Sequence, residues 1–154
     1  AHQAIDIYPR LEDIGPKAAI IGGGTVGCEL GIELARKGRE VHIFEAMGVL
    51  HRTPSEFYNM ALNFYMGKEE TLHAKTGVRV MKISEKGELT YEENGEIHTE
   101  QFDMIILSAG FKPKHAEEAE LYDTGISTHT VGDCVRVGQI RECNESAYFT
   151  ASNL

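Results

Sequence analysis

Cysteine is scarce in this chain, with three residues among 154. Cys28, Cys134 and Cys143 form no Cys-x-x-Cys pair, and their spacing does not suit a zinc or iron–sulfur site. The seven histidines are scattered as well, so the sequence predicts no metal site. Thiols without a disulfide framework are typical of a reducing compartment, which favours a cytoplasmic protein.

A long hydrophobic run and an excess of positive charge are also absent. No apolar run approaches the ~20 residues that cross a bilayer, and the first residues lack the features of a secretory signal. The formal net charge of -9 opposes attraction to nucleic acid or anionic lipid. We therefore expect a soluble chain with one core and with neither nucleic-acid nor membrane partners.

The first half of the chain shows a strand–helix–strand pattern. Residues 18–21 are a short apolar run bounded by glycine, which is typical of a buried parallel strand. Apolar residues recur at helical spacing over 25–37, and Gly38 suits the left-handed position that follows a helix. Residues 41–44 then predict a second strand, which ends at Glu45. These segments form one βαβ unit.

The later elements are less regular. Residues 53–56 fit a capping box with Pro54 at the first helical position, which predicts a helix from there towards Gly77. Gly67 interrupts that pattern. Asn94-Gly95 between two alternating segments predicts a β-hairpin. The other expected elements are strands at 78–83, 104–107 and 126–131, a helical or loose segment at 115–120, and a helix at 144–153.

The segment Gly22-Gly23-Gly24-Thr25-Val26-Gly27 matches the pattern Gly-x-Gly-x-x-Gly. It follows a buried strand and opens a helix, which is the context that dinucleotide binding requires. Gly22 permits a tight turn, Gly24 lets the backbone approach a pyrophosphate, and Gly27 lets the helix pack closely on the strand. The free amides at the helix start offer hydrogen bonds to the phosphates.

A dinucleotide site of this kind also needs an acidic residue at the end of the second strand, and the sequence has one there. Glu45 ends the second strand about twenty residues beyond the loop, where its carboxylate can accept hydrogen bonds from ribose hydroxyls. This predicts NADH rather than NADPH. Arg52 could meet a 2′-phosphate, but no arginine follows Glu45 directly. Asp133 and Cys134 are adjacent without an identifiable base, so we name no catalytic residue.

Three segments in this order resemble the pyridine nucleotide-disulfide oxidoreductase superfamily. They are the glycine loop with Glu45, the segment Ser108-Ala109-Gly110-Phe111-Lys112-Pro113, and Val131-Gly132-Asp133-Cys134. Within the superfamily the likeness is greatest to the C-terminal region of NADH:flavin oxidoreductases of the 2-enoate and 2,4-dienoyl-CoA reductase type. That likeness includes residues 139–148 and extends over 17–154.

The resemblance implies a domain organisation and a set of site residues. It implies an N-terminal lead-in at 1–16, an NAD(P)H-binding Rossmann domain at 17–108, and a return to an incomplete FAD-binding domain at 109–154. The glycine loop and Glu45 would hold NADH, Ala109 and Gly110 would mark the crossover, and Asp133 would face the flavin's ribityl and pyrophosphate region. FAD would be bound in the full-length parent, with FMN and an iron–sulfur cluster outside this chain.

The sequence also departs from that family. The first glycine-rich loop, which grips the FAD pyrophosphate, is absent, as are the flavin-binding barrel and the cysteine cluster. The isolated chain would therefore be inactive, and its partners would be the dinucleotide and the remainder of the parent flavoprotein. Ser146 occupies a position of the last helix that is often glycine in the family, which leaves close flavin approach in question there. A homo-oligomeric parent is left open.

The sequence therefore predicts an α/β fold with a three-layer, Rossmann-like parallel sheet and an added antiparallel hairpin. Its expected role is to orient NADH for hydride transfer to a flavin that passes it to an activated alkene. Two alternatives stay open. One is a fragment of an FAD/NAD disulfide reductase or NADH oxidase, and the other is a non-catalytic NAD-sensing regulatory domain.

Overall fold

The computed structural model describes all residues except 52, 54, 114 and 123, and for 115–118 it describes the backbone alone. The chain divides into two compact units, Ala1–Gly110 and Phe111–Leu154, which we describe separately. Arg52 and Pro54, each of which entered a sequence interpretation, lie outside the described residues.

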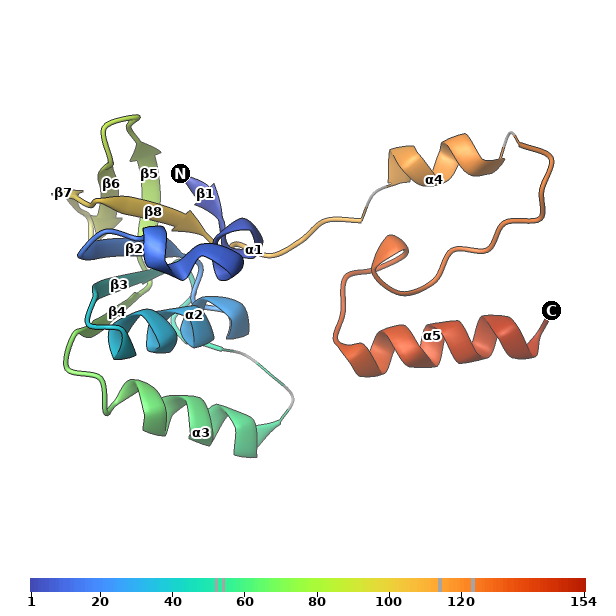
Figure 1. Cartoon of the computed structure of the whole chain (residues 1–154), viewed down its shortest axis with the longest axis horizontal. Coiled ribbons are helices and arrows are strands. Elements are labelled where there is room, and N and C mark those ends of the chain that lie inside the picture. The colour runs from blue at the N-terminus through green and yellow to red at the C-terminus, as the bar shows by residue number, and fades with distance from the viewer. Residues whose placement is uncertain (52, 54, 114, 123) are drawn as a thin grey trace. The chain divides into compact units, whose positions relative to one another are not determined.

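A five-stranded parallel sheet forms the centre of the first unit, in the order β1-β8-β2-β3-β4 (Figure 1). Its strands are His2–Gln3 (β1), Lys17–Ile21 (β2), Glu40–Glu45 (β3), Leu72–Thr76 (β4) and Met104–Leu107 (β8). β2 is central and pairs in parallel with both β3 and β8, so that Ile21 lies opposite Phe44 on one side and Leu107 on the other. The carboxyl ends of these three strands therefore meet at one end of the sheet.

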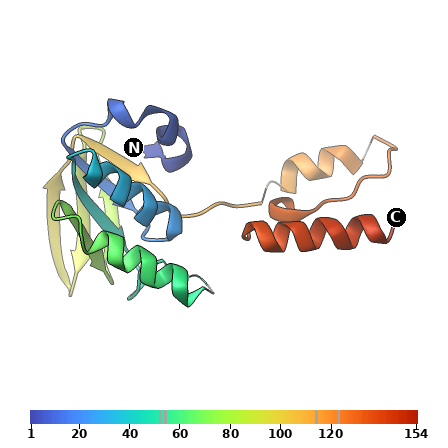
Figure 2. The same ribbon diagram turned by 60° about the horizontal axis from the view of Figure 1, so that its bottom comes forward.

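Helices cover one face of this sheet. They include α2 (Thr25–Arg36) and α3 (Glu56–Met66), which Figures 1 and 2 show side by side. Ala18 and Ile20 of β2 are fully buried on the helical face, where they pack with Leu30 and Leu34 of α2. Ala19 between them is buried on the opposite face. Because both faces are covered, β2 is a continuous apolar run instead of an alternating one.

A separate antiparallel sheet covers the second face. Its strands are Arg79–Ile83 (β5), Glu88–Glu93 (β6) and Glu96–Gln101 (β7), in that order. Asn94 and Gly95 both have positive φ, as the expected two-residue hairpin turn requires. The ring of Tyr91 lies 4.8 Å from that of Phe44 on the parallel sheet, and both side chains are buried. The expected hairpin is thus confirmed, and β5 extends it to three strands.

The chain ahead of residue 17 contributes to the first unit's core. β1 pairs with β8, and α1 (Ala4–Ile7) and a short 3-10 helix (Tyr8–Asp13) follow it. Ala4, Ile7 and Ile14 are buried in the same cluster as Ala18 and Ile20. The sequence pattern predicts no helix or strand in this segment.

The region after β3 corrects two expectations. α3 begins at Glu56, and its N-cap is Ser55, whose hydroxyl accepts a hydrogen bond from the Tyr58 N–H at 3.3 Å. The helix ends at Met66 with Gly67 as its C-cap and does not continue towards Gly77. Residues 72–76 instead form β4, the strand that the sequence analysis missed.

The second unit contains α4 (His115–Tyr122), a 3-10 turn (Gly132–Cys134) and α5 (Ile140–Ser152). None of its described residues is buried. α5 begins four residues before the expected 144, because Gln139 and Glu142 form a capping box ahead of it. The strand expected at 126–131 is wrong: this segment is irregular in the structure.

The fold class is confirmed as α/β with a Rossmann-like parallel sheet between helices and a second, antiparallel layer. In the part of the chain that the structure describes, no helix is both long and apolar enough to cross a membrane.

Candidate functional site

The glycine-rich loop joins the carboxyl end of β2 to the start of α2. Gly22 has a φ of 107°, and a Cβ there would lie 2.4 Å from the carbonyl oxygen of Ser108. A Cβ at Gly27 would lie 2.0 Å from the carbonyl oxygen of Gly22. Both obstacles are backbone atoms, so a side chain at Gly22 would press against the segment after β8, and one at Gly27 would force α2 away from the end of β2.

Gly24 lies in a different environment, although it belongs to the same loop. It is the N-cap residue of α2, and a Cβ there would meet no described atom within 4 Å. No described side chain caps this helix, so the N–H groups of Thr25 and Val26 have no partner within the helix. The start of α2 therefore presents free donors and the positive end of the helix dipole to an open space.

Glu45 lies directly beside this loop. One carboxylate oxygen, Oε2, accepts a hydrogen bond from the Gly23 N–H at 2.7 Å, and Oε1 accepts one from the Met47 N–H at 2.7 Å. Each oxygen keeps a second lone pair. The carboxylate therefore fixes the loop and the following turn, and it retains acceptor capacity for a further hydroxyl.

His51 and Cys28 hold the loop through hydrogen bonds, although no sequence pattern connects them with the site. The carbonyl oxygen of Gly23 accepts hydrogen bonds from the His51 N–H at 2.7 Å and from the Cys28 thiol at 3.3 Å. Burial raises the pKa of Cys28 to about 11, so its thiol stays protonated at neutral pH. His51 gave no signal in the sequence, because its partners are distant in the chain.

The segment that follows β8 lies beside the glycine loop, on the side of β2 opposite to β3. The Ser108 N–H donates to the carbonyl oxygen of Ile21 at 2.7 Å, which places Ser108 against the glycine loop. Ala109 and Gly110 follow as exposed residues, and Gly110 has a φ of 90°. The structure thus brings the carboxyl ends of β2, β3 and β8 together around the loop.

Asp133 belongs to the second unit, where residues of α5 and the preceding turn bind it. Its Oδ1 accepts hydrogen bonds from the Gly138 N–H at 3.0 Å and from the Cys143 thiol at 3.2 Å. The hydrogen bond to Asp133 raises the pKa of Cys143. The neighbouring Gly132 has a φ of 61° and donates its N–H to the Ser146 hydroxyl at 3.2 Å. The turn at 132–134 is therefore fixed to α5 by side-chain contacts.

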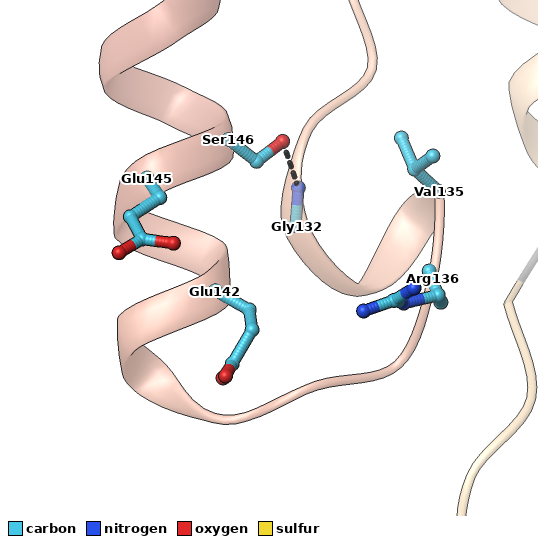
Figure 3. A pocket seen from close by; sticks show the side chains of 6 residues that line it. All are labelled: Gly132, Val135, Arg136, Glu142, Glu145 and Ser146. Atoms are coloured by element: carbon cyan, nitrogen blue, oxygen red, sulfur yellow. Dashed lines mark hydrogen bonds between the residues drawn. The ribbon is translucent and has the colours of Figure 1, made fainter.

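A pocket of about 310 Å³ lies between this turn and α5 (Figure 3). It is lined by Gly132, Val135, Arg136, Glu142, Glu145 and Ser146. Asp133 is not among these residues. Over the whole described part of the chain, no group of three or more histidine, cysteine or acidic residues is placed to hold a metal ion.

A family model described as pyridine nucleotide-disulphide oxidoreductase matches residues 6–137. The chain belongs to this family. The resemblance that the three sequence segments carry is therefore confirmed. Members of the family are flavoproteins that use FAD together with a nicotinamide dinucleotide, and the homologues of this chain are oxidoreductases.

Individual relatives agree with this assignment. An NADH oxidase of Thermoanaerobacter brockii is 29% identical over 90% of this chain, and a cinnamate reductase of Clostridium sporogenes is 26% identical over 99% of it. The solved 2-naphthoyl-CoA reductase complex with 2-naphthoyl-CoA shares the fold, with a TM-score of 0.84 over 99% of this chain at 21% identity. The chain spans 21%, 23% and 23% of the lengths of these three proteins.

Proposed function

We propose that the first unit binds NADH and holds it for hydride transfer to a flavin. The observation that carries this proposal is the open N-terminus of α2 at Gly24, beside the carboxylate of Glu45. Free N–H groups at a helix start favour a pyrophosphate, and a carboxylate at the end of the next strand favours ribose hydroxyls. When bound, NADH supplies the hydride that reduces the flavin.

In this proposal each part of the loop has its own task. Gly22 lets the loop pass close to the segment after β8, Gly27 keeps α2 close to the end of β2, and Gly24 leaves the space that the phosphates occupy. Thr25 and Val26 offer their N–H groups, while Ala109 and Gly110 lead the chain from residues 17–108 into the return segment at 109–154. Residues 1–16 would be the lead-in, which adds β1 to the edge of the sheet and buries Ala4, Ile7 and Ile14 against it.

We further propose that the whole enzyme reduces activated alkenes, as the 2-enoate and 2,4-dienoyl-CoA reductases do. The similarity to a cinnamate reductase and the fold shared with a 2-naphthoyl-CoA reductase support this. FMN and an iron–sulfur cluster would belong to other parts of that enzyme. The three free thiols accord with a cytoplasmic location.

Glu45→Ser is expected to reduce the preference for NADH over NADPH. The partly exposed carboxylate should repel a 2′-phosphate by roughly 1–3 kcal/mol, which corresponds to about a ten- to hundredfold preference for NADH in the wild type. The variant loses both the acceptor and the repulsion, so NADH should bind more weakly while NADPH gains or holds steady. Fluorescence titration with both nucleotides measures the ratio.

Two further variants separate charge from geometry at this position. Glu45→Gln keeps an acceptor oxygen but removes the charge. NADPH should therefore bind more tightly than to wild type, and the loss of NADH affinity should be smaller than in Glu45→Ser. Glu96→Ser makes the same change in net charge at the exposed first residue of β7 and should leave the ratio unaltered. An unchanged ratio in Glu45→Ser would remove this carboxylate from the specificity role.

We propose that Asp133 and α5 form one side of an FAD site that other residues of the enzyme complete. The purified 154-residue chain should therefore retain no FAD and give a colourless preparation after desalting. The Asp133 carboxylate already binds the chain itself through Oδ1, and the sequence holds a single Gly-x-Gly-x-x-Gly loop. A stoichiometric flavin spectrum after desalting would contradict this and would assign the loop at Gly22 to FAD.

A second candidate is a part of an FAD-dependent NADH oxidase or disulfide reductase, which the similarity to the NADH oxidase favours. The same NADH site would then supply electrons to oxygen or to a disulfide. A flavin-binding barrel encoded in the same open reading frame would support the alkene reductase, and a redox-active Cys-x-x-Cys would support the disulfide reductase. Nucleotide binding without any associated flavin domain would instead favour the NAD-sensing regulatory domain.

A further inference from the structure

The peptide group between Gly23 and Gly24 is held by its carbonyl oxygen. This oxygen accepts from the His51 N–H and from the Cys28 thiol, and both donors belong to buried residues. A trans peptide is planar, so its N–H points opposite to its carbonyl oxygen. The Gly24 N–H therefore points away from these two donors, towards the open side of the loop.

We propose that His51 and Cys28 are positioning residues that aim the Gly24 N–H at the pyrophosphate of the bound dinucleotide. This inference rests on the proposed NADH function and adds residues to it that lie outside the glycine pattern. Neither residue touches the nucleotide. Each acts through the peptide that it orients, and Glu45 fixes the preceding peptide through the Gly23 N–H.

His51 can take this role because α3 holds it in an unusual conformation. Its φ is 36°, and its side chain is buried at 6% exposure. Nε2 lies 2.9 Å from Oδ1 of Asn63, and Nδ1 lies 3.4 Å from Oδ1 of Asn59. The amide oxygen of Asn63 can only accept, so the 2.9 Å contact places a ring N–H on Nε2. Asn63 of α3 thus fixes the ring, and with it the backbone N–H of His51, which donates to the carbonyl oxygen of Gly23.

Cys28 supports the same oxygen from the first turn of α2. Its side chain is fully buried, and with a pKa of about 11 it remains a thiol donor throughout the neutral range. A thiol is a weak donor, but this one is enclosed and has a fixed acceptor. Its importance therefore lies in geometry: it keeps the Gly23 oxygen turned inward when the loop is free of ligand.

Cys28→Ala is expected to weaken NADH binding by about tenfold, which is the effect of losing one well-aimed hydrogen bond to a charged group. Cys28→Ser retains a donor and should recover most of the affinity. The control is Leu62→Ala, which removes a buried side chain of α3 from the cluster that contains Cys28. It should lower the free energy of unfolding without changing the Kd for NADH.

Asn63→Leu tests the role of His51. Asn63 is an exposed residue of α3, so the variant should fold. It removes the acceptor for Nε2, and we expect a several-fold rise in the Kd for NADH, on the scale of one neutral hydrogen bond. Asn63→Asp keeps an acceptor and should restore binding. In both series the amide resonance of Gly24, measured by NMR without nucleotide, should shift in the weakened variants and return in the restored ones.

The outcomes separate the two proposals. Wild-type protein that binds no NADH would refute the proposed function, while the Gly24 resonance would still report whether His51 and Cys28 orient this peptide. Wild-type binding with unchanged Kd values and an unmoved Gly24 resonance in Cys28→Ala and Asn63→Leu would overturn the positioning role. Equal losses of affinity in Leu62→Ala and Cys28→Ala would also overturn it, because the effect would then follow stability alone.

Discussion

Gly24→Val is expected to abolish NADH binding and to leave the fold in place. Beyond its neighbours in the chain, a Cβ at this position meets no described atom within 4 Å, and the backbone is in a conformation that valine adopts readily. The branched side chain would fill the space in which we place the pyrophosphate and would cover the free N–H groups of α2. Loss of those charge-assisted hydrogen bonds should raise the Kd by about a hundredfold or more.

Calorimetric titration with NADH measures this loss, and circular dichroism reports the fold. Valine is a poorer N-cap residue than glycine, so the variant should also lose roughly 1 kcal/mol of stability. Gln139→Val removes the N-cap of α5 in the other unit and provides a control with a comparable loss. Unchanged NADH affinity in a folded Gly24→Val protein would mean that the ligand does not cross this loop.

The central elements of the fold could be predicted because their signals are local. β2 is an apolar run bounded by glycine, and α2 has apolar residues at helical spacing. The turn at Asn94 and Gly95 needs two positive φ angles, which these residue types tolerate. In each case the residues that carry the signal are neighbours in the sequence.

The elements that were missed depend on distant partners. β4 is an edge strand with only Leu72 and Lys75 partly buried, so it shows no hydrophobic pattern, and its structure comes from pairing with β3. β1 has two residues and exists through its pairing with β8. The reverse error occurred at 126–131, where β-branched residues favour a strand but the described chain pairs no strand with them.

The candidate site also contains both residues with a local sequence signal and residues that depend on distant partners. The glycine loop and Glu45 could be found from spacing, because a βαβ unit brings the ends of consecutive strands together. The role of His51 could not, since it depends on the Gly23 oxygen on one side and on Asn63 of α3 on the other. Residues that orient a binding loop through hydrogen bonds have no fixed spacing from that loop in the sequence.

Gly27→Ala is expected to destabilise the first unit, although helix propensity alone predicts the opposite. Gly27 lies inside α2, where alanine is favoured over glycine by about 1 kcal/mol. Against this, the new Cβ would lie 2.0 Å from the carbonyl oxygen of Gly22, and a backbone atom at the end of β2 cannot move aside alone. Overpacking of a rigid core costs about 1–3 kcal/mol, occasionally more, so the clash should outweigh the propensity.

Less the propensity gain of about 1 kcal/mol, the expected net change is a loss of about 1–2 kcal/mol, which in a unit of this size lowers the Tm by roughly 4–8 °C. Gly31→Ala on the same helix is the matched control. Its Cβ would lie 2.9 Å from Cδ1 of Ile43, the end of a flexible side chain that can rotate away. Urea and thermal unfolding should therefore rank wild type close to Gly31→Ala and well above Gly27→Ala. If Gly27→Ala proved as stable as Gly31→Ala, close packing of α2 on β2 would not be what requires glycine at the end of the loop.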